Sequence, residues 1–122
     1  MYTISSVLQD ISRGCMVHNM NEDCFSYRIV YFVNENGKGR KCYVDTSYEN
    51  LRRSLENIIR GNLTTTNNIV LSAVTARKSG ENVSLISRSY PFSFGEYFEQ
   101  IIGKREKEYK TANYGRRRLN WC

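Results

Sequence analysis

The clearest pattern of apolar and polar positions runs from residue 25 to residue 61. An aromatic and β-branched run over Phe25–Val33 predicts a strand, because such side chains fit a pleated, half-buried surface. Asn36-Gly37 can supply the positive φ angles of a tight turn, and Arg40–Asp45 then returns as the partner strand. The sequence therefore predicts a hairpin, followed by a helix that ends at Gly61.

That helix has a predicted start and a predicted buried face. Thr46 and Glu49 have the spacing of a capping box, in which two side chains bond to free backbone amides of the first turn. Its apolar positions recur three or four residues apart, as one face of a helix requires: Tyr48, Leu51, Leu55, Ile58 and Ile59. We expect this face to pack against the sheet.

A shorter helix is predicted near the N-terminus. Apolar residues from Ile4 to Ile11 follow the helical spacing, and Gly14 is expected to end the helix soon afterwards. The stretch that follows is polar and irregular, and we expect an extra edge strand near Met16–Asn19.

The second half of the chain repeats the order of hairpin and helix. Strands are predicted over Ile69–Thr75 and Val83–Ser89, and Pro91 is expected to make a corner after them. Ser93 and Glu96 form a second capping-box spacing before an apolar helical face: Phe94, Tyr97, Phe98, Ile101 and Ile102. The predicted fold class is α+β, an antiparallel sheet of two hairpins, each followed by a capped helix, with the short N-terminal helix in addition.

Composition agrees with a single domain over residues 1–122. Hydrophobic residues make up 40% of the chain and charged residues 25%, as in ordinary globular proteins. No run approaches the roughly 18 apolar residues of a membrane span, and the first residues lack the features of a secretory signal, so we expect a cytoplasmic protein without membrane partners. The net charge is +6, and residues 104–118 carry seven Lys and Arg against two Glu. This basic C-terminal segment, 104–122, is expected to complete a binding site for an anion.

Catalytic and metal-binding signatures are weak. Cys15, His18 and Cys24 could hold zinc, but a fourth ligand is lacking, and reduced cysteines buried as small apolar residues are the simpler interpretation. The chain has no phosphate-binding glycine loop, no dinucleotide fingerprint and only one histidine. We therefore expect a non-enzymatic protein without a cofactor.

Arginine next to aromatic residues is the feature that points to a ligand. A guanidinium matches phosphate oxygens two at a time, and aromatic rings stack on bases. Two hypotheses follow: a protein that binds a small phosphorylated nucleotide, as a homo-oligomer with sites between subunits, or a module for RNA or single-stranded DNA whose basic tail follows the phosphates. The stretches Phe25–Gly61 and Ser89–Cys122 also resemble the small phage Thoeris anti-defence proteins. That resemblance implies an oligomeric sponge that sequesters cyclic ADP-ribose isomers, which are host immune signals, without converting them.

The candidate contacts follow from side-chain chemistry rather than from the resemblance. The pyrophosphate is expected to bind two arginines of the domain body and one or more of the C-terminal run: Arg28 and Arg88, with Arg116, Arg117 and Arg118. The adenine is expected to stack on one of three rings and to have its edge read by one of two amides: Phe92, Tyr114 or Trp121, and Asn113 or Asn120.

Overall fold

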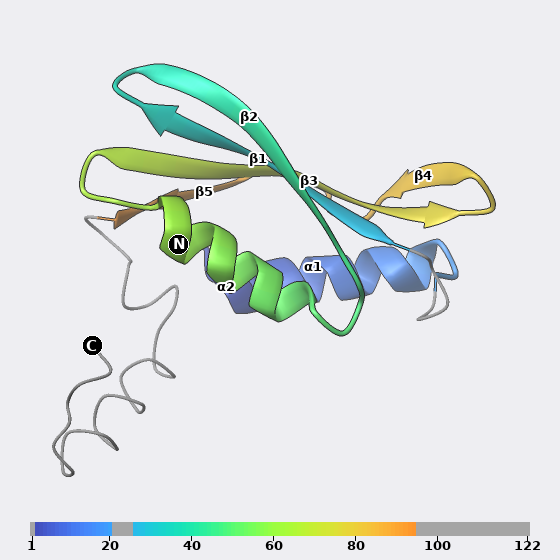
Figure 1. Ribbon diagram of the computed structural model, residues 1–122. Coiled ribbons are helices and arrows are strands. Elements are labelled where there is room, and N and C mark those ends of the chain that lie inside the picture. The colour runs from blue at the N-terminus through green and yellow to red at the C-terminus, as the bar shows by residue number, and fades with distance from the viewer. Residues whose placement is uncertain (1, 21–25, 95–122) are drawn as a thin grey trace, which may run out of the picture.

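A computed structural model describes residues 2–20 and 26–94 of the chain. In order, its elements are α1 (Ile4–Val17), β1 (Tyr27–Glu35), β2 (Lys38–Thr46), α2 (Leu51–Asn62), β3 (Asn67–Lys78), β4 (Glu81–Ser84) and β5 (Tyr90–Ser93). All strand pairs are antiparallel, in the order β2-β1-β3, and β3 pairs with both β4 and β5. Both helices lie against one face of this sheet (Figure 1). The fold class is α+β, as predicted.

The first hairpin confirms the prediction closely. Tyr27 pairs with Thr46 at one end and Glu35 with Lys38 at the other. Asn36 and Gly37 form the turn between them with φ angles of 50° and 82°. Both values lie in the left-handed region that a two-residue hairpin turn of this kind requires.

The core lies between the sheet and the two helices. Alternate residues of β1 are fully buried toward the helices, and Tyr27, Ile29 and Val33 have no exposed surface. They meet apolar positions from the helices and from β3: Ile4, Val7, Ile11, Leu55, Ile59, Ile69, Leu71 and Val74. Tyr31, on the same face of β1, is buried there as well.

Helix α1 is longer than predicted because Gly14 does not end it. Thr3 caps the N-terminus reciprocally with Ser6: its hydroxyl accepts from the Ser6 amide at 3.2 Å. Gly14 lies within the helix, where a Cβ atom would come within 2.8 Å of the Leu85 backbone. Glycine at this position therefore permits a close approach of α1 to the backbone of Leu85. The edge strand expected near Met16–Asn19 is wrong, since the helix continues to Val17.

Helix α2 does not begin with the predicted capping box. Thr46 is the last residue of β2, and its hydroxyl accepts a hydrogen bond from Ser54 at 2.7 Å. The helix starts at Leu51 after Asn50, whose side chain makes no capping bond. Tyr48 precedes the helix and is 42% exposed, so it is not part of the buried helical face.

The second half of the sheet differs most from the prediction. The tight turn at Ser79-Gly80 leads into β4, which pairs with β3 as a hairpin. The strand expected over Val83–Ser89 is present only in part, because β4 begins at Glu81 and ends at Ser84. The chain then crosses to β5, where Pro91 pairs with Val70 on the same edge of β3. Proline has no backbone N–H to donate. It is tolerated in an edge strand because one side of such a strand has no partner strand that needs this donor.

Over residues 2–20 and 26–94, the order is therefore a helix, a hairpin, a second helix and three further strands, rather than two hairpin–helix units. The helix predicted over Phe94–Ile102 and its capping box at Ser93 and Glu96 lie largely outside the described residues. In the described ranges, no helix is long and apolar enough to span a membrane.

Candidate functional site

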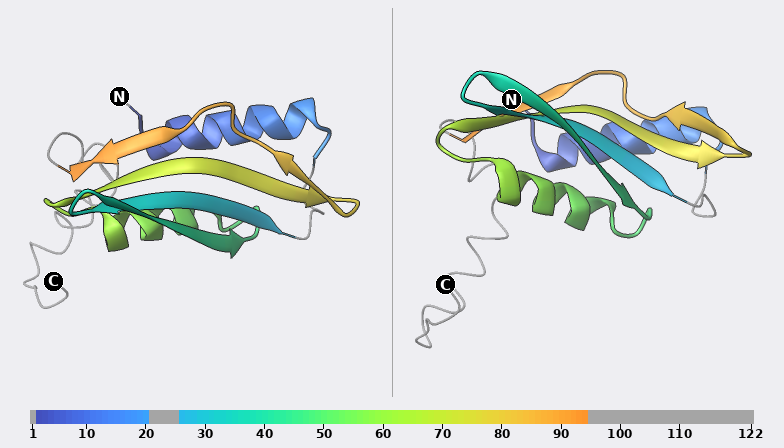
Figure 2. Two further views of the ribbon diagram at one scale, coloured as in Figure 1. Left: turned by 90° about the horizontal axis from the view of Figure 1, so that it is seen from above. Right: turned by 45° about the horizontal axis from the view of Figure 1, so that its top comes forward.

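The face of the sheet opposite the helices carries the candidate site. Within residues 2–20 and 26–94, no helix covers it, as the view from above shows (Figure 2). Because strand side chains alternate between faces, the residues between the buried positions of β1 point to this open face. The strand registers then order the open face into rows that run across the sheet.

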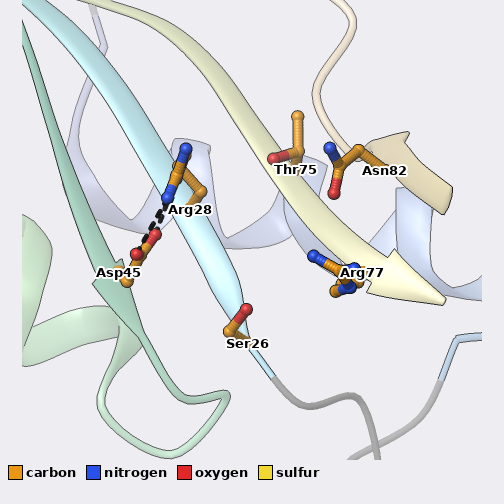
Figure 3. Close-up of a pocket in the computed structure, with 6 residues that line it drawn as sticks. All are labelled: Ser26, Arg28, Asp45, Thr75, Arg77 and Asn82. Carbon is orange, nitrogen blue, oxygen red and sulfur yellow. Dashed lines mark hydrogen bonds and ion pairs between the residues drawn. The ribbon is translucent and has the colours of Figure 1, made fainter. Parts of the chain in front are cut away.

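Two polar rows lie at one end of the open face. The first row is Asp45, Arg28, Thr75 and Ser84, taken from β2, β1, β3 and β4 in turn. The second row contains Ser26, Arg77 and Asn82. Six of these seven side chains line one cavity of about 100 Å³, which we call the polar trough: Ser26, Arg28, Asp45, Thr75, Arg77 and Asn82 (Figure 3).

One wall of the polar trough is an ion pair. Arg28 donates from Nε to Oδ1 of Asp45 at 2.7 Å and from Nη2 to Oδ2 at 3.0 Å. The guanidinium also lies 4.1 Å from the centre of the Tyr43 ring. The hydrogen bond from Arg28 lowers the pKa of Asp45, and the same bond raises the pKa of Arg28. The pair is therefore fully charged at neutral pH.

The other wall offers unused hydrogen-bond donors. Figure 3 shows Arg77, Thr75 and Asn82 opposite the ion pair. The Arg77 guanidinium makes no hydrogen bond or ion pair with the residues that the structure describes, and the same holds for the side chains of Thr75, Asn82 and Ser26. A guanidinium, two hydroxyls and an amide directed at one small cavity form a set of donors suited to a phosphate group.

An apolar strip adjoins the polar trough along the strands. The next two rows of the open face consist mainly of apolar residues: Tyr43, Val30 and Ala73, then Phe32, Val70 and Pro91. Tyr43 is 58% exposed, and Val30 and Phe32 are half-buried. Successive rows lie roughly 7 Å apart, since they are two residues apart along a strand. This apolar strip is within reach of a group attached to a phosphate in the trough.

The predicted site residues do not come together in the described structure. Arg28 lies on the open face, whereas Arg88 lies on the helix side of the sheet, in a groove of about 260 Å³ beside α1. There Arg88 donates to the Tyr2 hydroxyl at 3.2 Å. Phe92 is only 2% exposed and belongs to the core, so its ring has no face for a base, and the expected stacking there is wrong. The remaining predicted contacts lie outside the described residues: Asn113, Tyr114, Arg116, Arg117, Arg118, Asn120 and Trp121.

The groove beside α1 is organised around a buried carboxylate. Asp10 Oδ2 accepts hydrogen bonds from the Tyr90 hydroxyl and from the amide and hydroxyl of Ser87. Burial alone would raise the pKa of Asp10, but these hydrogen bonds outweigh it and lower the pKa. Burial and the bond to Asp10 raise the pKa of Tyr90. This network joins α1 to β5 and is a stabilising contact of the fold.

The three residues considered as possible zinc ligands lie only partly in the described ranges. Cys15 is buried and His18 is exposed, while Cys24 lies outside those ranges. No group of three or more His, Cys, Asp or Glu residues in 2–20 and 26–94 is placed to hold a metal ion.

Comparison of the chain with protein-family models, with curated proteins and with solved structures finds no match.

Proposed function

We propose that this chain captures a small phosphorylated cyclic nucleotide, of the class of cyclic ADP-ribose isomers, and holds it without converting it. The observation that carries the proposal is the polar trough. Its Arg77 guanidinium has no partner in the described ranges and lies beside the free donors of Thr75 and Asn82. Phosphate oxygens only accept hydrogen bonds, so they match this set of donors.

The volume of the trough limits which part of the ligand enters it. A cavity of about 100 Å³ holds a phosphate group but not a nucleoside. The base would therefore lie outside, over the apolar strip, where Tyr43 and Phe32 offer aromatic surface and Arg28 a stacked guanidinium. Stacking of a base on an aromatic side chain contributes roughly 1–3 kcal/mol.

Capture without conversion fits the chemistry of the trough's acidic residue. Both oxygens of Asp45 accept bonds from Arg28, and its pKa is lowered. A carboxylate in that state is a weak general base, because a base works best with a pKa near the operating pH.

The proposal extends to assembly and to biological role. One chain presents an open face and a small trough, which cannot enclose a dinucleotide-sized ligand, so we propose that several copies associate and complete each other's sites. Residues 104–122, with their basic side chains, are proposed to contribute to the same sites. Capture of the signal in the bacterial cytoplasm would block antiphage immunity.

Calorimetry with cyclic ADP-ribose isomers tests the proposal, followed by chromatography of the ligand released from heat-denatured protein. The expected result is saturable binding and recovery of unchanged ligand. Recovery of a converted product would show an enzyme instead, and the absence of binding by every isomer would overturn the proposal.

A second candidate function is binding of single-stranded nucleic acid. It is favoured by the open face itself, where the exposed Tyr43 ring and the Arg28 guanidinium adjoin Arg77 and Lys41 on one antiparallel sheet. Affinity for arbitrary RNA or DNA that falls steeply with salt concentration would support this function over the first.

A further inference from the structure

Among the described strands, β2 is the long one at an edge of the sheet. It pairs with β1 along all nine of its residues, and its other side meets no strand within residues 2–20 and 26–94 (Figure 2). No residue of β2 is buried. At the opposite edge, β4 and β5 have only four residues each, and β5 contains Pro91. Short strands and proline protect an edge from further pairing, and β2 has neither of these protections.

Alternate residues of β2 direct their backbone N–H and C=O groups outward, away from β1. The Arg77 amide donates to the Ser26 carbonyl at 3.2 Å, so Ser26 and the even-numbered residues of β1 bond to β3, and the odd-numbered residues bond to β2. In the register of the hairpin, the even-numbered residues of β2 are then the ones that bond to β1. The outward backbone groups belong to the odd-numbered residues, whose side chains share the open face: Gly39, Lys41, Tyr43 and Asp45.

We infer that β2 pairs antiparallel with β2 of a second copy of this chain, about a two-fold axis at Tyr43. In this register Lys41 lies opposite the partner's Asp45, and Asp45 lies opposite the partner's Lys41, so both charges are matched. The three outward pairs exchange two backbone hydrogen bonds each, or roughly six in all. On the other face of the strand, Cys42 lies opposite the partner's Val44, and both residues are already half-buried in a single copy.

The basic residues of β2 select this register. Lysine on an edge strand usually opposes pairing, and β2 carries Lys38, Arg40 and Lys41. A two-fold axis at Lys41 would place the two Lys41 side chains opposite each other, and an axis at Cys42 would leave each Lys41 opposite an uncharged residue. With the axis at Tyr43, the two Lys41 residues are about 13 Å apart along the strands, beyond the Debye length of about 8 Å at physiological salt. Like charges are therefore separated and opposite charges meet.

The pairing also joins the apolar strips of the two copies. Tyr43 lies in one row with Val30 and Ala73, so an axis at Tyr43 continues that row into the same row of the partner. The polar troughs of both copies then open onto one surface, which deepens the proposed association of copies. Use of this surface by a ligand depends on the proposed function, whereas the pairing itself does not. A two-fold pairing uses the β2 edge of both copies and therefore closes as a dimer.

Charge variants of the full chain, without ligand, test the pairing by sedimentation equilibrium. The unmodified chain is expected to dimerise. Lys41→Glu brings two carboxylates opposite each other twice in the interface and is expected to weaken dimerisation about tenfold or more, and Asp45→Lys brings two ammonium groups together with a similar effect. An equimolar mixture of these two variants is expected to pair, because each charge then meets its opposite. Arg53→Glu makes the same charge change on α2 and is expected to leave dimerisation unchanged.

Hydrogen exchange followed by NMR locates the contact. The amides of Lys41, Tyr43 and Asp45 point away from β1, so the pair is expected to protect them increasingly as protein concentration rises. Rapid exchange of all three amides at every concentration would overturn the inference, and so would undiminished dimerisation of Lys41→Glu. Failure of the two folded variants to pair in the mixture would also overturn it. Circular dichroism checks that both variants fold, and if Asp45→Lys does not, the exchange rates and Lys41→Glu decide.

The outcomes distinguish this inference from the proposed function, which calorimetry with cyclic ADP-ribose isomers tests. If an isomer binds to a chain whose β2 amides exchange rapidly at every concentration, the inference is overturned alone. If the β2 edges pair and no isomer binds, the proposed function is overturned alone.

Discussion

Replacement of Gly14 by alanine is expected to destabilise the protein, although alanine is the better helix former. Gly14 lies inside α1, and a Cβ atom there would come within 2.8 Å of the Cα and carbonyl carbon of Leu85, and closer still to the carbonyl oxygen. These are backbone atoms, which cannot rotate away as a side chain does. The helix and the segment around Leu85 would have to move apart.

Two opposing terms set the expected magnitude. Within a helix, glycine to alanine stabilises by about 0.5–1 kcal/mol, because glycine loses more backbone entropy on folding. Forcing additional atoms into a packed contact costs about 1–3 kcal/mol. The second term is near its upper end here, because the contact is with backbone. We therefore expect a net loss of about 1–2 kcal/mol, or roughly 4–8 °C in Tm for a chain of this length.

Gly61 provides the matched control. It lies within α2, and a Cβ atom there would meet nothing within 4 Å. Gly61→Ala is expected to stabilise by about 0.5–1 kcal/mol, the intrinsic helix preference. Urea denaturation of both variants, followed by far-ultraviolet circular dichroism, gives the two free energies of unfolding. Equal stabilisation by both substitutions would refute the close approach of α1 to Leu85.

Three further predictions concern the trough, the buried carboxylate and the hairpin turn. Arg77→Gln is expected to weaken binding of a phosphorylated ligand about tenfold or more, the worth of a hydrogen bond to a charged group, whereas Lys41→Gln on the same face changes it by less than about twofold; calorimetry decides. Asp10 has a lowered pKa in the fold, so it adds stability above its unfolded pKa near 3.8, and this stability is lost as pH falls through the folded pKa. Asp10→Asn should therefore flatten the acid branch of a stability-against-pH curve, and an unchanged acid branch would contradict this role. Gly37→Ala, at a φ of 82° with open space around it, is expected to cost about 1 kcal/mol through backbone strain alone, measured by urea denaturation; no loss of stability would contradict the turn geometry.

Local patterns predicted the first hairpin and the buried face of α2 because the causes are local. Asn36-Gly37 determines the turn, and the turn determines the register of β1 and β2. In α2, Leu55, Ile58 and Ile59 are buried as their spacing requires. These elements depend on residues that are near neighbours in the sequence.

Other elements depend on contacts that the local pattern does not contain. In the sequence, Gly14 looks like a residue that ends a helix. In the structure, glycine is needed there because α1 contacts the backbone of Leu85, which is 71 residues away along the chain. Thr46 looks like a helix cap, but pairing with Tyr27 keeps it in β2. Thr3 and Ser6 form the capping box of α1, and their three-residue spacing before an apolar run was a usable signal.

The candidate site was predicted only in part for the same reason. Arg28 was identified from its aromatic neighbours, but its partner Asp45 and the opposite wall with Arg77 are brought to it by strand pairing. A register drawn from the Asn36-Gly37 turn would have placed Asp45 across from Arg28. The long strand β3 gives no such marker for Arg77, so its place in the trough required the three-dimensional structure.

The central claim is that a phosphorylated ligand occupies the polar trough, and amide chemical shifts test it most directly. Titration of the ¹⁵N-labelled chain with a cyclic ADP-ribose isomer should shift the amides of Thr75, Arg77 and Asn82 more than those of the groove around Asp10. Saturable binding that leaves the three trough amides unshifted and moves the groove instead would contradict the claim.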